Sequence, residues 1–295
     1  MGARDPLPVV TLPLRTPGDE AREYQFHEKD FERVRKLIYK RAGINLSEHK
    51  QNMVYSRLSR RLRVHAMQTF GEYLDRFESD ADFGAAEEQE FVNALTTNLT
   101  SFYRESHHFP VLEEFLRAMP AGTAPKIWCA AASTGEEPYT IAITMTEAAG
   151  GRPAGALLAT DIDTNVLATA ARATYKLESA QACGEARLKR YFLRGKGGND
   201  GMVRVRPEVS QLVRFGQLNL LDEDYPLVRN FASQLDAVFC RNVMIYFDRK
   251  TQKEILGRIV RVLRPGGLLV VGHSENFTDC NESLVLRGKT VYMRK

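Results

Sequence analysis

Four cysteines among 295 residues are few, and their spacing argues against several classes of protein. They stand far apart, at Cys129, Cys183, Cys240 and Cys280, and none belongs to a C-x-x-C pair. A disulfide scaffold, a cysteine-based zinc site and a dithiol redox centre all need closer or paired cysteines. We therefore expect reduced thiols in a cytoplasmic protein that holds no metal.

Long apolar runs and a strong charge of one sign are also missing. The longest strongly apolar run, residues 268–271, is far shorter than the roughly 18 apolar residues that a membrane-spanning helix needs. The 41 Lys and Arg residues face 37 Asp and Glu residues, which leaves a net charge of +4. So small an excess argues against a nucleic-acid partner unless the basic residues gather in one place. We expect neither a nucleic-acid partner nor direct insertion into a membrane.

What is present is a chain of ordinary globular composition, 43% hydrophobic and long enough for two domains. Residues 1–25 carry several prolines and no periodic pattern, which indicates a flexible tail. Apolar residues then recur at three- and four-residue steps and predict an all-helical domain over residues 26–90, with its second helix at 47–67 and its third at 70–77. The acidic stretch 78–90 is expected to end this domain.

After about residue 124, short apolar runs alternate with helical patterns. The expected order is strand 126–131, helix 137–149, strand 156–159, helix 165–173, strand 212–215, strand 235–240, helix 251–263 and strand 268–272. This succession predicts an α/β fold, with a mostly parallel sheet between two layers of helices. A hairpin at 284–292 is expected to close the sheet at one edge.

One interruption of the alternation carries two strand patterns, 191–195 and 202–206, separated by a glycine-rich turn. We expect a small antiparallel β-subdomain there, over about residues 176–212, inserted into an α/β domain that spans 91–295. An insertion of this kind often carries a function of its own. A polar linker, 94–105, is expected between the helical and the α/β domains.

The turns after the strands should carry the ligand site, because open α/β sheets bind ligands at the carboxyl ends of their strands. The first turn, residues 130–137, keeps only Gly135 of a glycine-rich fingerprint. It ends in Glu136 and Glu137, whose charges repel a pyrophosphate, disfavour a nicotinamide dehydrogenase and favour an amine-bearing ligand. A tight packing turn with no ligand is the alternative interpretation.

Polar residues after the later strands point to the same end of the sheet. Asp161 is placed to accept two ribose hydroxyls, while Asp163 or Thr164 would cap the following helix. Two further pairs predict one converging pocket, namely Asn219 with Leu220 and Arg241 with Asn242. The linker is dense in hydrogen-bonding groups, although an ordinary linker could have the same composition. His107 and His108 lack spaced metal-ligating partners and indicate a helix start.

Six ordered motifs make the sequence resemble one known family. They read T-T-N-L-T-x-F-x-R-E-x-H-H-F-P at 96–110, A-A-A-S-T-G-E-E-P-Y at 130–139, A-T-D-I-D-T at 159–164, N-L-L at 219–221, F-C-R-N-V-M-I-Y-F at 239–247 and G-H-S-E at 272–275. Over about residues 26–295 the chain resembles the bacterial chemotaxis receptor methyltransferases, the CheR family. The resemblance implies a small N-terminal helical domain followed by a class I, Rossmann-like methyltransferase domain.

The resemblance also implies an activity. A methyl group would pass from S-adenosylmethionine to glutamate side chains of chemoreceptors, giving γ-glutamyl methyl esters and S-adenosylhomocysteine without a metal. A free glutamate has a pKa of about 4.3, so the attacking carboxylate is already ionised at neutral pH and needs no general base. One departure from the family pattern is Ala131, where many relatives have glycine.

The resemblance assigns roles to individual residues. The implied cofactor-binding residues are Asn98, Thr100, Arg104, Gly135, Glu137, Asp161, Asn219, Leu220, Arg241 and Asn242. Arg104 is also expected to hold the incoming carboxylate as a catalytic residue, and Tyr246 to orient it or to contact the methyl group.

Two surfaces are expected to meet a receptor, and the protein is expected to act as a monomer recruited to receptor arrays. The basic face of the second helix, which could also be an ordinary solvated face, comprises Lys50, Arg57, Arg60, Arg61 and Arg63. The inserted subdomain could tether a receptor's C-terminal pentapeptide by strand addition or serve only as a stabilising flap. Its candidate residues are Arg194, Gly195, Gly197, Arg204 and Arg206.

The fold alone does not fix the substrate, so a methyltransferase acting on another protein or on nucleic acid is the main alternative. The turn 241–246 lacks the paired prolines expected for methylation of base amino groups. A cofactor sensor without catalytic activity would have lost Arg104 or Tyr246, and both are present.

Overall fold

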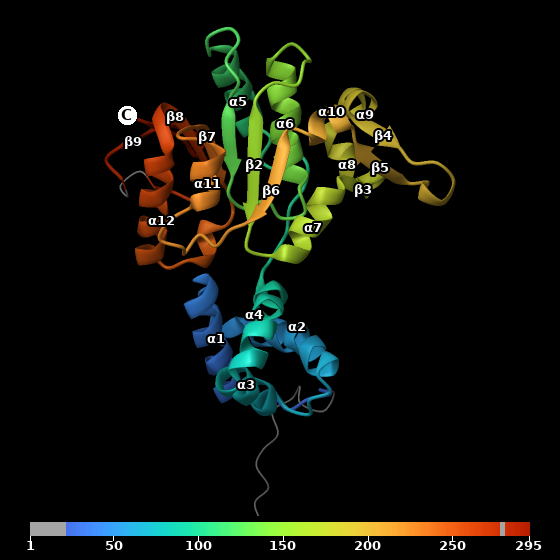
Figure 1. Cartoon of the computed structure of the whole chain (residues 1–295), viewed down its shortest axis with the longest axis vertical. Coiled ribbons are helices and arrows are strands. Elements are labelled where there is room, and N and C mark those ends of the chain that lie inside the picture. The colour runs from blue at the N-terminus through green and yellow to red at the C-terminus, as the bar shows by residue number, and fades with distance from the viewer. Residues whose placement is uncertain (1–21, 278–280) are drawn as a thin grey trace, which may run out of the picture.

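The computed structural model describes residues 22–277 and 281–295, which form a small helical domain and a larger α/β domain (Figure 1). Most of the expected tail, residues 1–21, lies outside the described residues. The last residues of that tail pack against the helical domain. The backbone N–H of Tyr24 donates to the hydroxyl of Tyr55 over 3.2 Å, and the Tyr24 ring meets Phe70 edge-on. These contacts begin a few residues before the predicted boundary of the helical domain at residue 26.

The helical domain has one helix more than the sequence predicted. Its elements are α1 (Glu28–Ala42), η2 (Glu48–Lys50), α2 (Gln51–Val64), α3 (Phe70–Ser79) and α4 (Ala81–Leu95). The stretch expected to end the domain is α4, which Asp80 caps by accepting the N–H of Phe83 over 3.0 Å. Its acidic residues are compatible with packing because Glu87 meets the basic Arg61 of α2, while Phe91 enters the core.

The α/β domain shows the expected alternation. Its sheet strands are β1 (Lys126–Cys129), β2 (Ala156–Asp161), β6 (Val213–Gln217), β7 (Leu235–Cys240), β8 (Leu263–Val271), β9 (Leu284–Gly288) and β10 (Val291–Arg294). The helices around them are α5 (His108–Arg117), α6 (Glu136–Ala148), α7 (Thr164–Arg172), α11 (Pro226–Phe231), η5 (Met244–Tyr246) and α12 (Arg249–Val262). The predicted mostly parallel sheet and its closing hairpin are thereby confirmed.

The order of the strands places the ligand crevice. The sheet runs β6-β2-β1-β7-β8-β10-β9; the first five strands are mutually parallel, and β10 is antiparallel to both of its neighbours, β8 and β9. Strand β1 lies between β2 and β7, where the order of the chain reverses, and Ile127 is in register with Leu157 on one side and Ala237 on the other. A reversal of this kind opens a crevice at the carboxyl ends of the strands.

Helices bury both faces of this sheet, as its nearly continuous apolar strands require. One core contains Leu112 of α5 and Ile141 of α6, and the opposite core contains Val228 of α11 and Ile255 of α12. In Figure 1 the helical domain lies at the other end of the long axis from α5 and the top of α6. No helix in the described part of the chain is both long and apolar enough to cross a bilayer.

The inserted subdomain contains the predicted hairpin and a third strand. Its elements are β3 (Thr174–Lys176), α8 (Leu177–Ala180), η3 (Gln181–Cys183), α9 (Glu185–Tyr191), β4 (Phe192–Arg194), η4 (Gly197–Asn199), β5 (Met202–Val205) and α10 (Pro207–Ser210). The order β3-β5-β4 makes β5 the central strand, so only β3 and β4 have an outer edge. The subdomain projects from the sheet beside α6 and α7 (Figure 1).

Candidate active site

A cavity of about 410 Å³ opens at the crevice and takes its walls from both domains. Ten of the eleven predicted cofactor and catalytic residues line it: Asn98, Thr100, Arg104, Glu137, Asp161, Asn219, Leu220, Arg241, Asn242 and Tyr246. Gly135 does not line the cavity and instead shapes the turn behind it. Its φ is +99°, and a Cβ atom there would lie 2.6 Å from the Tyr175 hydroxyl oxygen and 2.9 Å from the Ala170 Cβ, so this position fits glycine.

Asp161 lies at the end of β2 with acceptor capacity to spare. One carboxylate oxygen accepts the N–H of Ser133 over 2.8 Å, and the other accepts the N–H of Asp163 over 3.0 Å. Each oxygen keeps a further lone pair, which suits a pair of ligand hydroxyls. Burial raises the pKa of this carboxyl above its ordinary value, although backbone hydrogen bonds oppose the shift.

Asp163 is the helix cap, which settles the alternative between Asp163 and Thr164. Its Oδ1 accepts the N–H groups of Asn165 and Val166, and its Oδ2 accepts the hydroxyl of Thr96 over 2.6 Å. The same Oδ2 also accepts the side-chain amide of Asn98 over 2.8 Å. Asp163 therefore starts α7 and anchors the linker at the same time.

The polar residues of the linker have specific partners. The hydroxyl of Ser133 donates to the Asn98 carbonyl over 2.9 Å, and the guanidinium of Arg104 donates to the Leu99 carbonyl over 2.6 Å. Tyr103 and Glu105, on either side of Arg104, adopt positive φ angles of 54° and 51°. Such angles are uncommon outside glycine and indicate that surrounding contacts dictate the path of the linker.

Arg241 connects the turn after β7 to α6 and to the linker. Its side chain is fully buried, pairs with Glu137 through Nη1 and donates from Nη2 to the Arg104 carbonyl over 2.6 Å. The other oxygen of Glu137 is 3.4 Å from the Cys129 thiol, which remains a protonated donor because burial raises its pKa. The structure thus shows Arg241 bound to protein groups around the cavity, whereas the sequence predicted cofactor contact alone.

Sequence reasoning assigned no role to Glu105, which the structure places at the centre of this network. One oxygen lies 2.9 Å from His273 Nδ1, and the other accepts the His273 backbone N–H over 3.0 Å. Asn242 Nδ2 donates to it over 3.2 Å, and Arg241 Nη2 lies 3.4 Å away. Burial opposes ionisation, but these bonds and the charge of Arg241 outweigh it and lower the pKa of Glu105 to about 2.

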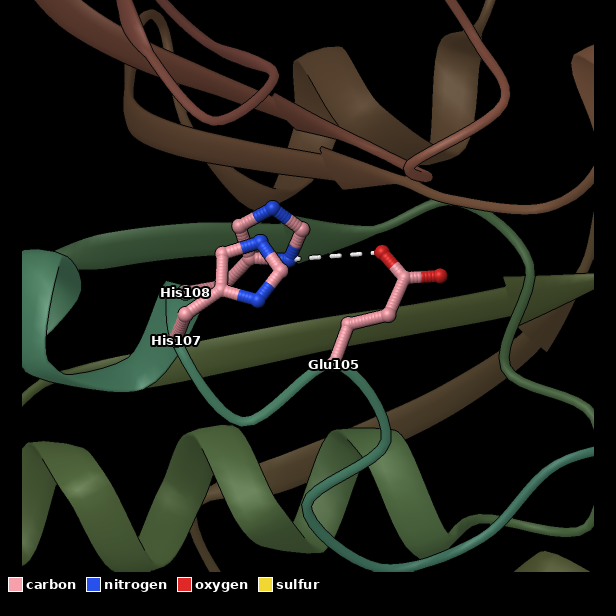
Figure 2. Close-up of side chains that lie close together, drawn as sticks. All are labelled: Glu105, His107 and His108. Carbon is pink, nitrogen blue, oxygen red and sulfur yellow. Dashed lines mark ion pairs between the residues drawn. The ribbon is translucent and has the colours of Figure 1, made fainter.

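Figure 2 shows Glu105 with His107 and His108. In the described part of the chain these are the one group of three metal-ligating side chains close enough together to share a metal ion. His108 Nδ1 lies 3.8 Å from the Glu105 carboxylate. Burial and the charge of Arg241 lower the pKa of His108 to about 4, so its ring is neutral, and its Nε2 lies 2.9 Å from the Lys289 carbonyl. The neighbouring Arg241 cation and the donors already bound to Glu105 make this group unfavourable for a divalent ion.

A second buried carboxylate, Glu275 of the G-H-S-E motif, fixes the turn that carries Tyr246. It accepts the N–H groups of Gly272 over 2.6 Å, Asn242 over 3.0 Å and Met244 over 2.8 Å. Burial raises its pKa, and the backbone donors oppose that shift. A glutamate four positions after the end of a buried strand, β8, was the signal for this role in the sequence.

The helical domain supplies the remaining wall of the cavity, which sequence reasoning missed. Gly43 at the end of α1 has a φ of +68°, and a Cβ atom there would lie 2.8 Å from Leu221 and 3.0 Å from Phe247. The Asn219 amide, expected to face a cofactor, donates to the Arg41 carbonyl of α1 over 2.7 Å. Asn219 therefore joins the two domains while it lines the cavity.

The predicted basic docking face is only partly free. Arg61 points into the helical domain and pairs with the buried Glu87 over 2.6 Å, Arg57 donates to the Thr96 carbonyl, and Arg63 pairs with Glu23. In the described residues Lys50 and Arg60 are exposed and have no such partner. Helical spacing alone could not reveal that Arg61 faces an acid of α4.

The candidate tether residues fall on different parts of the inserted subdomain. Arg204 lies on the central strand β5 and Arg206 directly after it, so neither offers a free strand edge. Arg194 ends the outer strand β4 and is exposed. A Cβ atom at position 195 would lie 2.0 Å from the Asn199 carbonyl oxygen, so only glycine fits there. Gly197 has a φ of +59°, which also favours glycine. Both glycines therefore shape the turn after β4.

Comparisons with known proteins agree with this architecture. Residues 29–96 match a family model described as "CheR methyltransferase, all-alpha domain", and residues 98–293 match "CheR methyltransferase, SAM binding domain". The chain is 50% identical over 273 residues to a chemotaxis protein methyltransferase of Klebsiella aerogenes, covering 92% of this chain and 91% of that protein. It is 48% identical to chemotaxis protein methyltransferase 2 of Pseudomonas aeruginosa, covering 95% and 99%. It is 49% identical to a chemotaxis protein methyltransferase of Escherichia coli, covering 89% of each.

Proposed function

This chain belongs to the CheR methyltransferase family, and on that premise we propose that it methylates glutamate side chains of chemoreceptors, giving γ-glutamyl methyl esters. The observation that carries the proposal is the charge arrangement of the cavity. Asp161 and the buried Glu137 line the cavity from β2 and α6, while Arg104 and the exposed Lys50 line it from the linker and from η2. The acids suit hydroxyl and amine groups of a ligand, and the cations suit a carboxylate substrate.

The residues fit S-adenosylmethionine, which when bound supplies a methyl group activated by the sulfonium charge. Asp161 would accept the ribose hydroxyls with its spare lone pairs, and Glu137 would face the methionyl amine. Asn98, Thr100, Asn219, Leu220 and Asn242 complete the walls of the cavity.

Transfer to a carboxylate asks for alignment and exclusion of water, because a glutamate with a pKa of about 4.3 is ionised before it binds. Arg104 would hold the incoming carboxylate with the guanidinium nitrogens that the Leu99 carbonyl leaves free. Tyr246, on the turn fixed by Glu275, would orient the same group with its hydroxyl. No side chain needs to remove a proton in this reaction.

Receptor docking would rely on the basic residues that remain exposed. Lys50 and Arg60 are the main candidates, because Arg57, Arg61 and Arg63 have partners within the chain. A second contact would use the inserted subdomain, where the outer edge of β4 could add a receptor's C-terminal peptide as a further strand. We further propose that the protein works as a cytoplasmic monomer at receptor arrays, without a metal and without nucleic acid.

The test is transfer of labelled methyl from S-adenosylmethionine to the cytoplasmic fragment of a methyl-accepting chemoreceptor. Label is expected on the fragment and not on a matched fragment whose methyl-accepting glutamates are replaced by alanine. Equal labelling of both fragments, or labelling of nucleic acid in their place, would favour the alternative substrates.

A further inference from the structure

Two large aliphatic side chains stand exposed on the wall of the cavity. Leu99 of the linker is 79% exposed and Ile245 of η5 is 51% exposed, and both line the same cavity as Arg104 and Tyr246. Exposed large apolar residues are scattered elsewhere on this chain, but these two flank the residues proposed to handle the acceptor carboxylate. Ile245 precedes Tyr246 in the chain, and the carbonyl of Leu99 is bound by Arg104.

The backbone under each of these side chains is fixed. Around Leu99, Ser133 donates to the carbonyl of Asn98 over 2.9 Å, and Arg104 donates to that of Leu99 over 2.6 Å. Leu99 is therefore displayed by a held segment of the linker. Because the backbone is already fixed, binding would not have to order the loop at this point.

Ile245 is held in the same way. Glu275 accepts the N–H of Met244 over 2.8 Å, and the carbonyl of Tyr246 accepts the N–H of Asn45 over 2.8 Å. The two residues that enclose Ile245 in the chain are thus tied to the α/β domain on one side and to the helical domain on the other. The backbone that carries Ile245 is therefore held in place from both sides.

The charges beside this apolar pair identify the kind of partner. Arg104 and the exposed Lys50 line the same cavity, whereas Glu137 is buried. A surface of this composition fits an acidic helical segment that presents a glutamate with aliphatic side chains one turn away. Residues three or four positions apart lie on one face of a helix, so such neighbours can reach the wall while the glutamate enters the cavity.

We propose that Leu99 and Ile245 form an apolar clamp that seats the substrate helix beside the cavity through its aliphatic side chains. This inference rests on the proposed function, because the occupant of the clamp is the methyl-accepting helix of the receptor. The clamp acts through apolar burial, so its contribution differs from that of the basic docking residues in being insensitive to salt.

The test compares L99S, I245S and the double variant with the unaltered protein in methylation of a chemoreceptor cytoplasmic fragment. The double variant should raise the KM for the fragment about tenfold or more, at low salt and at about 0.5 M salt alike. The affinity for S-adenosylhomocysteine, measured by calorimetry, should change less than about twofold. L99M keeps an apolar side chain of similar volume, so its KM for the fragment should be close to that of the unaltered protein and well below that of L99S.

V285S is the matched control, because Val285 is 44% exposed on β9 and does not line the cavity. It should leave both constants unchanged. An unchanged KM for the fragment in the double variant would overturn the clamp while leaving the proposed function intact. A parallel loss of S-adenosylhomocysteine affinity would also overturn it, because the two residues would then cover the cofactor. Failure of the unaltered protein to methylate the fragment would overturn the proposed function and the clamp together.

Discussion

The backbone N–H of Asn45 donates to the carbonyl oxygen of Tyr246 over 2.8 Å and joins the helical domain to the turn after β7. The domain proposed to meet the receptor therefore builds part of the cavity beside a residue proposed for catalysis. A receptor that shifts α1 against the sheet would change the position of Tyr246. Receptor binding and cofactor binding are thus expected to affect each other's affinity.

Gly43 should be essential to this junction. G43A adds a side chain at a φ of +68° and drives its Cβ atom toward Leu221 and Phe247. The αL conformation alone costs about 1 kcal/mol for alanine. G122A is the matched control, because Gly122 has a φ of +83° and no atom within 4 Å of a built Cβ. Thermal unfolding should show a larger loss for G43A, and only G43A should weaken S-adenosylhomocysteine binding. Equal effects of the two variants would mean that the contact is unimportant.

Glu105 should hold the linker through its charge. E105Q keeps the shape of the side chain but replaces an ionised acceptor, so the linker beside Arg104 loses its anchor to His273 and Arg241. We expect S-adenosylhomocysteine affinity to fall about five- to tenfold, the effect of weakening charge-assisted hydrogen bonds. E113Q, which removes an acid that pairs with the exposed Arg117, should bind S-adenosylhomocysteine normally. Calorimetry that finds equal affinity for the two variants would refute this role.

Protonation of the Glu105 carboxylate should also lower the stability of the protein in acid. Its pKa is about 2 when folded and near 4.5 when unfolded. A lowered folded pKa contributes stability that is fully present above the unfolded value and is lost as the pH falls toward the folded value. The free energy of unfolding should therefore drop between about pH 4.5 and pH 2 in the unaltered protein, and E105Q should show a smaller drop. Identical acid-unfolding curves would contradict the shift.

His108 should remain neutral well below the ordinary range of histidine. Its folded pKa is about 4 because of burial and the charge of Arg241, against 6.5 for a free side chain. The unfolded chain binds the proton first, so the stability linked to this group is complete above about pH 6.5 and falls toward pH 4. NMR titration of the ring should show no protonation above about pH 5. A midpoint near 6.5 would show that the ring is not held neutral.

Arg60 and Arg61 are neighbours in α2, but one is expected to serve receptor docking and the other the stability of the fold. R61A removes the arginine that neutralises the buried Glu87 and leaves this carboxylate with Tyr73 and His65, so it should lower the free energy of unfolding by about 3 kcal/mol. R60A removes an exposed cation and should leave stability unchanged while it raises the KM for a receptor fragment in a salt-dependent way. Equal stability of the two variants would contradict the ion-pair assignment, and a normal KM for R60A would count against docking on this face.

Patterns local to the chain predicted most of the fold. The strand ending at Cys240 and the helix after Gly135 follow from apolar periodicity and turn chemistry, because both are set by neighbouring residues. The polar residues at the strand ends converge because parallel strands share one carboxyl edge. Helix α4 escaped prediction because its acidic residues are neutralised by a partner, Arg61, that lies 26 positions before Glu87.

The connections within the site could not be predicted from spacing. Glu105 meets His273 across 168 positions, and Asn219 meets Arg41 across 178 positions. Nothing in a local pattern distinguishes such a carboxylate from an exposed one. The wall supplied by the helical domain was missed for the same reason, because residues 43–47 show only the composition of an ordinary connection between helices.

The most direct test of the account is the alkali stability of the product formed with a chemoreceptor fragment and labelled S-adenosylmethionine. A methyl ester on a glutamate is cleaved by mild base, so the label should leave the fragment as volatile methanol. R104A should form this product with strongly reduced turnover at saturating cofactor. Label that stays on the fragment after base treatment would show methylation at nitrogen or sulfur and would contradict the central claim.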